Sequence, residues 1–466
     1  MTFKVNKIQP SRSRPAQGVY HLAAKIVIVT LAIFAVGGIA VALYNGVSNT
    51  PLNLSLPSIV NTLGGTDLKT DANGKTNMLL LGTGGGAHSG GGLTDTMIVA
   101  SYDNAKGTLT MVSIPRDLYV KASGRSGSGS MMRINQVYNS LLGSRGKDQA
   151  MVELQEVITK ITGLEMQYYA KVDFQAFVET VDILGGIDVD VPKRLSDPLY
   201  PVETADGVFI RNETFTVEAG SQHMDGATAL KYVRSRHSTS DFDRSLRQQQ
   251  VIVALKDKAE QSNYLTSASK IRQLYSVISR NLETDVDLQE MVRGAYLAST
   301  LDRSKVVSVG LTSEGGKPGS VLYPPDRSLT GGASVLMPIG STVYREDFGI
   351  IKRFVDTVTN MPEIFTEKVP IVVSNGTKRS GLAQQGRAYL TQAGFTVIET
   401  ANSAEKLEKT RIIVSEEFLS SKTVEYLPLF LPAEVVTRPV DPNGETGSYV
   451  EIILGNDTTD ARLNRR

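Results

Sequence analysis

The sequence of 466 residues contains no cysteine and only four histidines. Without cysteine no disulfide can form, so the domains must be held together by core packing. The motifs HExxH and GxSxG are missing, as is any cluster of histidines and cysteines, which argues against a zinc peptidase and an α/β-hydrolase. The hydrophobic content of 41% is ordinary, and a chain of this length predicts two or three domains.

Charge is missing from residues 26–66, whereas residues 1–25 carry five basic side chains and no acidic one. Residues 26–44 are nineteen uncharged, mostly apolar residues, close to the minimum for a membrane-spanning helix. The basic flank predicts a cytoplasmic tail (1–25), a transmembrane helix (26–44) and export of everything that follows. A cleaved signal peptide, with Ala40-Val41-Ala42 as its cleavage site, is the competing interpretation.

A net basic charge is lacking from the part that would be exported. Subtracting the five basic residues of the tail from 49 leaves 44, against 48 acidic residues. Because a nucleic-acid-binding domain needs a net basic surface, we expect no nucleic acid partner.

Apolar runs and their spacing predict the secondary structure of the exported part. Residues 45–75, rich in Asn, Ser, Thr, Gly and Pro, are interpreted as a stalk, and residues 193–216 as an irregular insertion. Strands are predicted at residues 77–81, 97–102, 109–114, 187–191 and 306–311. Helices are predicted at residues 149–162, 174–184, 245–261, within 265–301, and at 348–358.

A second, smaller unit follows a predicted linker at residues 361–369. Its pattern of short strands and helices indicates an α/β or α+β module over residues 370–456. Residues 457–466 are polar and are interpreted as a flexible tail. The strands of this module are expected at residues 371–373, 396–399, 412–414 and 450–454, and its helices at 382–392 and around 424–427.

Four arginines fall within fourteen residues, at Arg234, Arg236, Arg244 and Arg247. Guanidinium groups bind phosphate oxygens in pairs. On a strand, Arg234 and Arg236 would point to one side, and on a helix Arg244, Arg247 and Gln248 would share a face. The segment can therefore be a polyanion site or a solvated charged loop. The apolar runs that flank it raise the weight of the first interpretation.

A glycine-rich loop at residues 82–92 follows a predicted strand and offers backbone N–H groups to a phosphate. It matches neither the P-loop nor the dinucleotide pattern. His88 within it can ligate a metal, bind phosphate or be an exposed spacer. Asp95 begins the next strand, where a lone aspartate is usually a turn or cap residue. Arg116 follows a third strand, where a surface ion pair is the competing interpretation.

The motifs in combination are more specific than any one of them. Together with the single N-terminal apolar segment they closely resemble the LytR-CpsA-Psr (LCP) family over about residues 76–360. The chain from VPIVVSNGTKRSGLAQQGRAYLTQAGFTVI onward resembles the LytR C-terminal domain, with less specific motifs. In chain order the motifs are NMLLLG, LTDTM, SIPRDLYV, RINQVYN, VDILGGIDVDVP and DGATALKYVRSRH followed by DFDRSLRQQQ.

The resemblance implies an α/β (α+β) LCP-type fold, a central mixed sheet flanked by helices, with a small α/β C-terminal domain. It implies a membrane-anchored, extracytoplasmic phosphotransferase that moves a glycopolymer from a polyprenyl-pyrophosphate carrier onto peptidoglycan. It also implies a long apolar pocket for the polyprenyl chain between sheet and helices. Residues 174–184 and 251–255 could line this pocket or form ordinary core.

Site residues follow from the same resemblance. Arg116, Arg234 and Arg236 would bind the pyrophosphate, and Asp95 would ligate Mg²⁺. The polar residues after the arginine pair would complete the site: Asp241, Arg244 and Gln248, with Arg247 adjacent. Asp95, Arg116, Arg234, Arg236 and Arg244 are the candidate catalytic residues.

One departure from the family pattern concerns the metal. The family usually has an aspartate two residues after the glycine that ends the first strand, and this chain has Gly84 there. His88 or water could compensate, or Mg²⁺ could be held by Asp95 and the substrate phosphates alone, since Mg²⁺ often takes only one or two carboxylates. A surface protein that binds lipid-linked polymer, with weak or no catalysis, is therefore the alternative function. A DNA-binding regulator conflicts with the predicted export.

Overall fold

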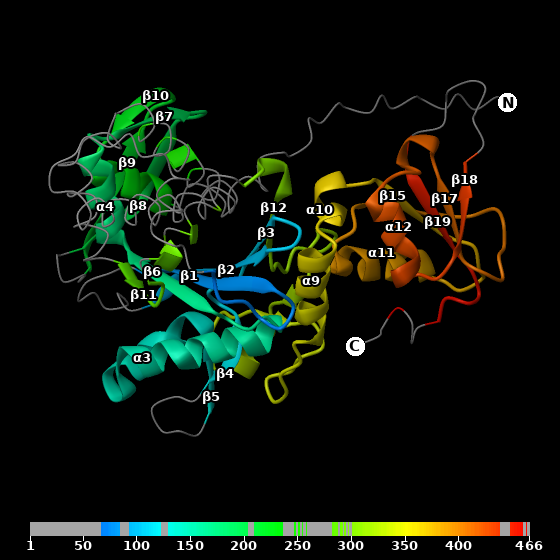
Figure 1. Cartoon of the computed structure of the whole chain (residues 1–466), viewed down its shortest axis with the longest axis horizontal. Helices are drawn as coiled ribbons and strands as arrows, with labels where there is room; N and C mark the ends of the chain where they lie inside the picture. The colour runs from blue at the N-terminus through cyan, green and yellow to red at the C-terminus, as the bar shows by residue number, and fades with distance from the viewer. Residues whose placement is uncertain are drawn as a thin grey trace.

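The structure, a computed structural model, describes most of the chain beyond residue 66 (Figure 1). None of the helices in these parts is long and apolar enough to cross a membrane. The predicted transmembrane helix at residues 26–44 lies outside them and stays a prediction. The described residues are 67–83, 93–122, 129–203, 209–235, 282–287, 301–438 and 448–459, with 247, 250, 251, 254, 258, 289–291, 293, 294, 297 and 463.

A six-stranded mixed sheet forms the centre of the first unit, in the order β11-β6-β1-β2-β3-β12. The sequence predicted four of these strands from their apolar runs and missed β6 and β11. The strands are β1 (Lys75–Thr83), β2 (Thr94–Asp103), β3 (Thr108–Ser113), β6 (Tyr168–Asp173), β11 (Leu282–Thr284) and β12 (Val306–Gly310). The predicted mixed sheet flanked by helices is therefore confirmed.

Two helices cover one face of this sheet, α3 (Ile134–Thr162) and α9 (Gly349–Asn360). Leu79 and Leu81 of β1 belong to the core on that side, whereas Leu80 belongs to a separate cluster on the opposite face. The prediction covered only the second half of α3. Gly146, with φ 79°, breaks the helical geometry there and interrupts the periodicity on which such a prediction depends.

The strand directions bring several strand ends to one edge of the sheet. β1 and β6 run parallel, β2 runs antiparallel to β1 and β3, and β12 runs parallel to β3. The carboxyl ends of β1, β3, β6 and β12 therefore lie at the edge where β2 begins. In open α/β sheets, ligands bind outside the carboxyl ends of strands.

Helices α4 (Phe174–Ile183) and α5 (Gly226–Arg234) form a second layer beyond that edge, since α4 follows directly on β6. Gly226 brings α5 against α4, because a Cβ there would lie 2.3 Å from the Val178 carbonyl oxygen. The strand geometry considered for Arg234 and Arg236 does not hold for Arg234. Asp225 caps α5 by accepting from the Thr228 N–H at 2.8 Å, and Arg234 is the last helical residue.

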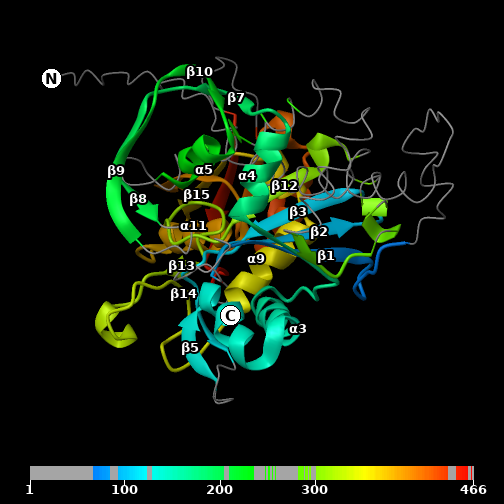
Figure 2. The same cartoon turned by 90° about the vertical axis from the view of Figure 1, so that its left-hand side faces the viewer.

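A long curved hairpin arches over α5 (Figure 2). It consists of β8 (Leu195–Glu203) and β9 (Phe209–Val217), and corrects the prediction of an irregular insertion at residues 193–216. Strand β8 was not predicted from the sequence because it contains Pro198 and Pro201. Proline cannot donate to a sheet ladder and is confined to edge strands. The remaining short strands of this unit are β4 (Tyr119–Ala122), β5 (Ser130–Arg133), β7 (Ile187–Val191), β10 (Gly220–Met224), β13 (Leu322–Tyr323) and β14 (Met337–Pro338).

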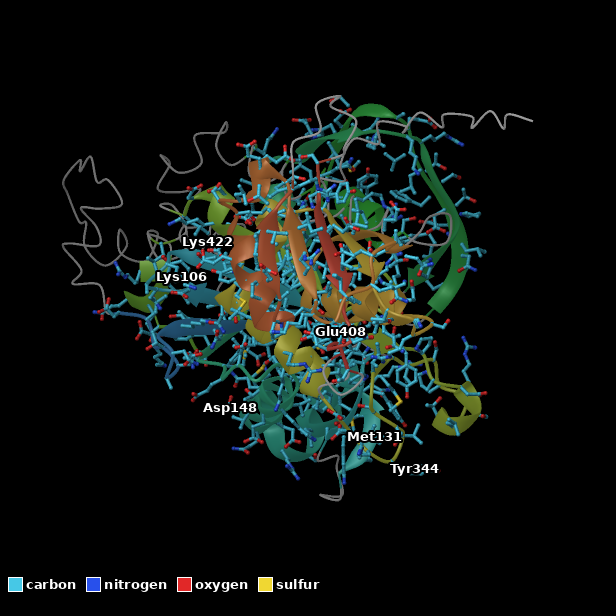
Figure 3. All side chains as sticks on the ribbon, turned by 90° about the vertical axis from the view of Figure 1, so that its right-hand side faces the viewer. Lys106, Met131, Asp148, Tyr344, Glu408 and Lys422 are labelled. Carbon is cyan, nitrogen blue, oxygen red and sulfur yellow. The ribbon has the colours of Figure 1, made fainter. Side chains whose placement is uncertain are left out.

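The C-terminal unit is a five-stranded mixed sheet in the order β16-β15-β19-β17-β18 with helices α11 (Leu382–Ala393) and α12 (Lys422–Phe430). It confirms the predicted small α/β module. Charged side chains such as Lys422 and Glu408 lie exposed around it (Figure 3). The strands are β15 (Ile371–Asn375), β16 (Val397–Asn402), β17 (Arg411–Val414), β18 (Glu434–Thr437) and β19 (Val450–Leu454).

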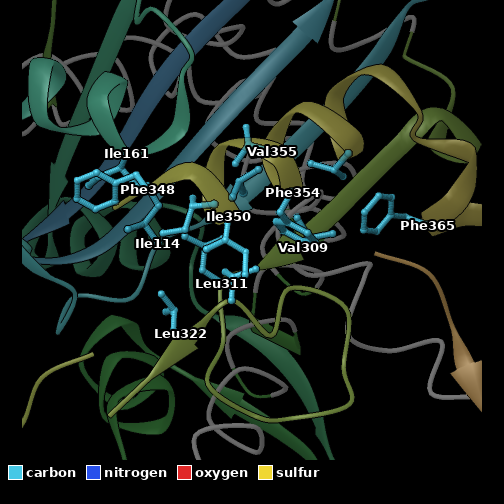
Figure 4. Packing of buried hydrophobic residues seen from close by; sticks show 14 of the residues in the cluster. Ile114, Ile161, Val309, Leu311, Leu322, Phe348, Ile350, Phe354, Val355 and Phe365 are labelled. Carbon is cyan, nitrogen blue, oxygen red and sulfur yellow. The ribbon is translucent and has the colours of Figure 1, made fainter. Parts of the chain in front are cut away.

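The segment between the units is not a plain linker. It contains the short helix α10 (Glu363–Glu367), whose Ile364 and Phe365 are buried. The Phe365 ring packs edge-on against Phe354 of α9, with 5.8 Å between ring centroids (Figure 4). One continuous hydrophobic cluster runs from the first sheet through α9 and α10 to the second sheet. The two units are therefore expected to move together.

Candidate functional site at the carboxyl edge of the first sheet

Asp95 occupies a β-bulge at the start of β2. Gly82 of β1 pairs with Thr96 and Thr83 pairs with Thr94, so one step along β1 corresponds to two steps along β2. Asp95 is the extra residue. A bulge bends the strand and redirects its side chains, and bulges are common next to active sites. The carboxylate is thus set apart from the regular in–out alternation of the strand.

Arg116 reaches Asp95 from the turn that follows β3. The Ile114 N–H donates to the Met97 carbonyl at 2.9 Å, which ties this turn to β2, and Leu118 N–H donates back to the Pro115 carbonyl. The Arg116 Nη1 atom lies 2.9 Å from Asp95 Oδ1, and each side chain is 35% exposed. The structure therefore brings these two predicted site residues together. The same contact is also the surface ion pair that was the competing interpretation of Arg116.

Two further charged residues extend this pair. Asp117 Oδ2 lies 3.8 Å from Arg116 Nε, and Asp117 Oδ1 lies 3.5 Å from Arg133 Nε. Arg133, at the N-cap of α3, also donates to the Ser334 carbonyl at 3.2 Å. Sequence reasoning assigned no role to Arg133 or Asp117. Both stand within quoted motifs, but only the fold shows that the two motifs meet.

The side chains at this edge suit a Mg²⁺ ion that takes few ligands from the protein. Among the described residues, Asp95 Oδ2 meets no hydrogen-bond donor, and no group of three or more acidic or histidine side chains is gathered. Mg²⁺ commonly keeps several waters and takes one or two carboxylates plus substrate phosphates. The predicted ligation of Mg²⁺ by Asp95 is compatible with this arrangement and stays a prediction. His88 and Gly84 lie outside the described residues.

Arg234 ends α5, and the residue after it is held from two sides. Ser235 Oγ donates to Asp197 Oδ2 of β8 at 2.6 Å, and Asp197 is 0% exposed. Arg247 is also buried. Its Nε donates to the Tyr232 carbonyl at 2.9 Å and its Nη2 donates to the Ser235 carbonyl. The structure thus uses Arg247 to hold the backbone beside Arg234, and its predicted contact with pyrophosphate stays untested.

The other predicted residues of the arginine segment, Arg236, Asp241, Arg244 and Gln248, lie outside the described residues. The predicted helix at residues 245–261 is described only at positions 247, 250, 251, 254 and 258, all helical. Asp197 and Ser235 were missed from the sequence. Ser235 stands between two arginines of a quoted motif, but nothing in the sequence pairs it with an aspartate 38 positions earlier.

An apolar cavity lies on the sheet face opposite α3. It is lined by β1 and β2 side chains such as Met78, Leu80 and Ala100, and by the helical residues Met291 and Leu297. Its volume of about 70 Å³ is well below the ~300–1,000 Å³ of typical ligand pockets. A cavity of this volume has room for only a small part of a long apolar chain.

The helices expected to line an apolar pocket do not line this cavity. Val181 and Leu184 near the end of α4 pack with Val251 and Ala254 in a separate hydrophobic cluster. These four described residues pack as core in this structure, and a role of the two helices in lining a larger pocket stays a prediction. The cavity instead lies between the sheet and described residues such as Val286, Met291 and Leu297, in a part of the chain that the sequence predicted only as helical.

Comparisons with known proteins find two family models in the chain. Residues 51–329 match the model of the LytR_cpsA_psr family, and residues 368–458 match that of the LytR cell envelope-related transcriptional attenuator. The cell wall biosynthesis protein LcpA of Corynebacterium glutamicum is 26% identical over 441 residues, which cover 85% of this chain and 79% of LcpA.

Two relatives from Bacillus subtilis are similar over shorter stretches. The polyisoprenyl-teichoic acid–peptidoglycan teichoic acid transferase TagV is 30% identical over 234 residues. The aligned part covers 50% of this chain and 53% of TagV. The crystal structure of TagU superposes with a TM-score of 0.39 at 20% identity, covering 61% of this chain and 96% of TagU.

Proposed function

The chain belongs to the LytR_cpsA_psr family, and from this premise we propose that it transfers a glycopolymer from a polyprenyl-pyrophosphate carrier onto peptidoglycan. The observation that carries the proposal is the Asp95–Arg116 pair at the carboxyl edge of the sheet. An apolar cavity on one face of the same sheet supports it. Together they offer a charged centre for phosphates and an apolar contact for a lipid.

The reaction is a phosphoryl transfer. An acceptor hydroxyl oxygen forms a bond to the phosphorus that carries the glycopolymer and gives up its proton to solvent. The bond from that phosphorus to the bridging oxygen breaks, and polyprenyl phosphate departs with the electron pair. Such transfers depend on positioning and on stabilising negative charge. Arg116 and Arg234 would bind the pyrophosphate oxygens, with Arg236 and Arg244 beside them. Bound at Asp95, Mg²⁺ would neutralise charge on the phosphates.

Two contacts would keep the arginine segment in place during this reaction. Asp197 holds the Ser235 hydroxyl and Arg247 holds the Ser235 carbonyl. Because these atoms belong to the residue directly after Arg234, the guanidinium group of Arg234 starts from an anchored backbone. Asp197 and Arg247 would then act as positioning residues.

The proposed location is the outer face of the cell membrane, with a cytoplasmic N terminus and the predicted helix 26–44 as a single anchor. This placement meets the needs of the reaction, since both the lipid-linked donor and peptidoglycan are then within reach. The partners are the polyprenyl-pyrophosphate-linked glycopolymer, peptidoglycan and membrane lipid.

The alternative is a surface protein that binds lipid-linked polymer with weak pyrophosphatase activity or none. Gly84, where the family usually has aspartate, favours it. The retained arginines argue against it. Mg²⁺-dependent release of polyprenyl phosphate from a purified pyrophosphate-lipid glycan, coupled to labelling of peptidoglycan, separates the two.

The deciding experiment compares wild-type full-length protein with Arg234→Ala and Arg236→Ala in this assay. We expect both variants to keep the wild-type unfolding temperature and to lose most of the transfer. A matched control is Arg194→Ala, which removes an exposed arginine paired with Glu218 on the β8–β9 side of the molecule. Transfer at the wild-type rate by Arg236→Ala would contradict the site assignment.

A further inference from the structure

The Oδ1 atom of the Asn135 side chain is buried and has no hydrogen-bond partner among the described residues. The residue as a whole is 5% exposed. Nearly all buried polar side-chain atoms in folded proteins are paired, because an unpaired one is costly. An unpaired buried acceptor calls for an explanation, and at a sheet edge that carries charged site residues a bound group would supply one.

The backbone of Asn135 is hydrogen-bonded to Arg116 and to Thr94, the residue before Asp95. Its backbone N–H donates to the Arg116 carbonyl at 3.3 Å, and its carbonyl accepts from Thr94 Oγ1 at 3.4 Å. Thr94 directly precedes Asp95 in the bulge. The second helical residue of α3 is thus bound to the turn after β3 and to the start of β2.

The direction of the Asn135 side chain follows from Tyr138, one turn later on α3. The Tyr138 hydroxyl lies 3.0 Å from Lys171 Nζ of β6 and 3.1 Å from Glu283 Oε1 of β11, so this helix face is turned to the sheet. Residues at i and i+3 share a face, and helical side chains tilt toward the N terminus. The Asn135 amide therefore lies between the first turn of α3 and the sheet edge that carries Asp95.

The first backbone N–H groups at this helix end already have partners. The Ile134 N–H donates to the Leu118 carbonyl at 2.8 Å, and the Arg133 N–H donates to Gln136 Oε1 at 3.2 Å. The start of α3 is thus no open anion site. What it presents to a ligand is the neutral side chain of Asn135.

We propose that the Asn135 amide binds a hydroxyl group of the sugar that accepts the glycopolymer, an inference that rests on the proposed transferase function. An amide offers both a donor and an acceptor, as a hydroxyl does, whereas the neighbouring arginines are donors only. Guanidinium groups suit the charged phosphates of the donor substrate. Asn135 suits the uncharged acceptor, and its place beside Asp95 puts that hydroxyl next to the phosphate.

The test uses the full chain and two readouts from one donor: transfer to a peptidoglycan glycan, and release of polyprenyl phosphate with water as the acceptor. Asn135→Leu keeps the approximate shape and removes both hydrogen-bonding atoms. We expect transfer to the glycan to fall about tenfold, as for one lost hydrogen bond. Hydrolysis should stay within about twofold, and the unfolding temperature should stay equal or rise, because a buried unpaired group is gone.

The matched control is Ser101→Ala. Ser101 is 3% exposed, its Oγ also lacks a partner, and it lies on β2 about 20 Å from Asp95 at the usual rise per residue. Its removal should leave both readouts unchanged. Without transfer by the wild-type protein, the proposed function itself fails. With wild-type transfer present, normal transfer by Asn135→Leu, an equal loss of both readouts, or an unfolded Asn135→Leu protein would each overturn the inference.

Discussion

Arg116 Nη1 lies 2.9 Å from Asp95 Oδ1, so the turn after β3 closes onto the bulge at the start of β2. Each residue neutralises the other in this arrangement. A pyrophosphate entering the site offers Arg116 a doubly charged partner, and Mg²⁺ offers one to Asp95. We therefore expect donor and Mg²⁺ to bind cooperatively, since together they can replace the internal pair.

Asp95→Asn tests the proposed metal ligand. The substitution keeps the size of the side chain and removes its charge, so Mg²⁺ loses its protein carboxylate. We expect transfer to fall by about 100-fold, in the range of other charge-stabilising groups. Activity should also stop responding to Mg²⁺ concentration. Asp117→Asn, which removes the neighbouring carboxylate, should retain that response, and a retained response in Asp95→Asn would place the metal elsewhere.

Arg116→Ala tests the other half of the pair. Exposed ion pairs contribute about 0–1 kcal/mol to stability, so the unfolding temperature should hardly change. Transfer should fall by about 100-fold because one group that stabilises phosphate charge is gone. Calorimetric titration with inorganic pyrophosphate and Mg²⁺ checks the binding part. A variant that binds and transfers normally would leave the pair as a surface contact only.

Ser235→Ala tests the anchoring of the arginine segment. The loss of the hydroxyl removes the 2.6 Å contact to buried Asp197. We expect destabilisation by about 1–3 kcal/mol, because the aspartate is left without this donor. The KM for the donor should rise about tenfold, as for other residues that orient a binding group. Glu213→Gln breaks a different contact between β9 and α5, to Lys231, and should leave the KM unchanged.

Gly294→Leu tests the apolar cavity. Gly294 lines the cavity from the helical segment opposite the sheet, so a leucine side chain would fill it. Stability should not suffer, because leucine is favoured over glycine in a helix by about 0.5–1 kcal/mol. The KM should rise for a long polyprenyl donor and stay constant for a donor with a short chain. An equal change for both donors would show that the prenyl chain does not use this cavity.

Glu367 makes the junction between the two units sensitive to acid. Burial pushes the pKa of Glu367 up, but hydrogen bonds from Ser421 and Thr423 outweigh it and lower the pKa below its ordinary value of 4.5. A lowered folded-state pKa adds stability that is present above pH 4.5 and is lost as the pH falls through the folded-state value. Thermal unfolding between neutral and acidic pH should show this loss. Glu367→Gln should have a lower unfolding temperature at neutral pH and a weaker dependence on acid.

Local patterns predicted much of the first sheet. β1, β2, β3 and β12 were found from apolar runs bounded by turn residues, because a strand buried on both faces has that composition. The strand geometry considered for Arg234 and Arg236 does not hold for Arg234, since a two-residue spacing fits a strand only if the surrounding apolar residues also alternate. In residues 226–234 they follow the helical period instead, and Asp225 caps the helix. The short helix α10 was missed because five residues carry too little periodicity.

The sequence by itself determined which functional groups are present: arginines that can bind phosphate and one carboxylate at Asp95. The family resemblance implied how they are used. Only the tertiary structure decided which of these residues meet. The bulge at Asp95, the contact with Arg116 and the burial of Arg247 on backbone carbonyls depend on strand register and on elements far apart in the chain. Asn135 is the clearest example of what the sequence could not predict. Its Oδ1 atom is unpaired because it is buried beside the sheet edge, and no spacing along the chain encodes that burial.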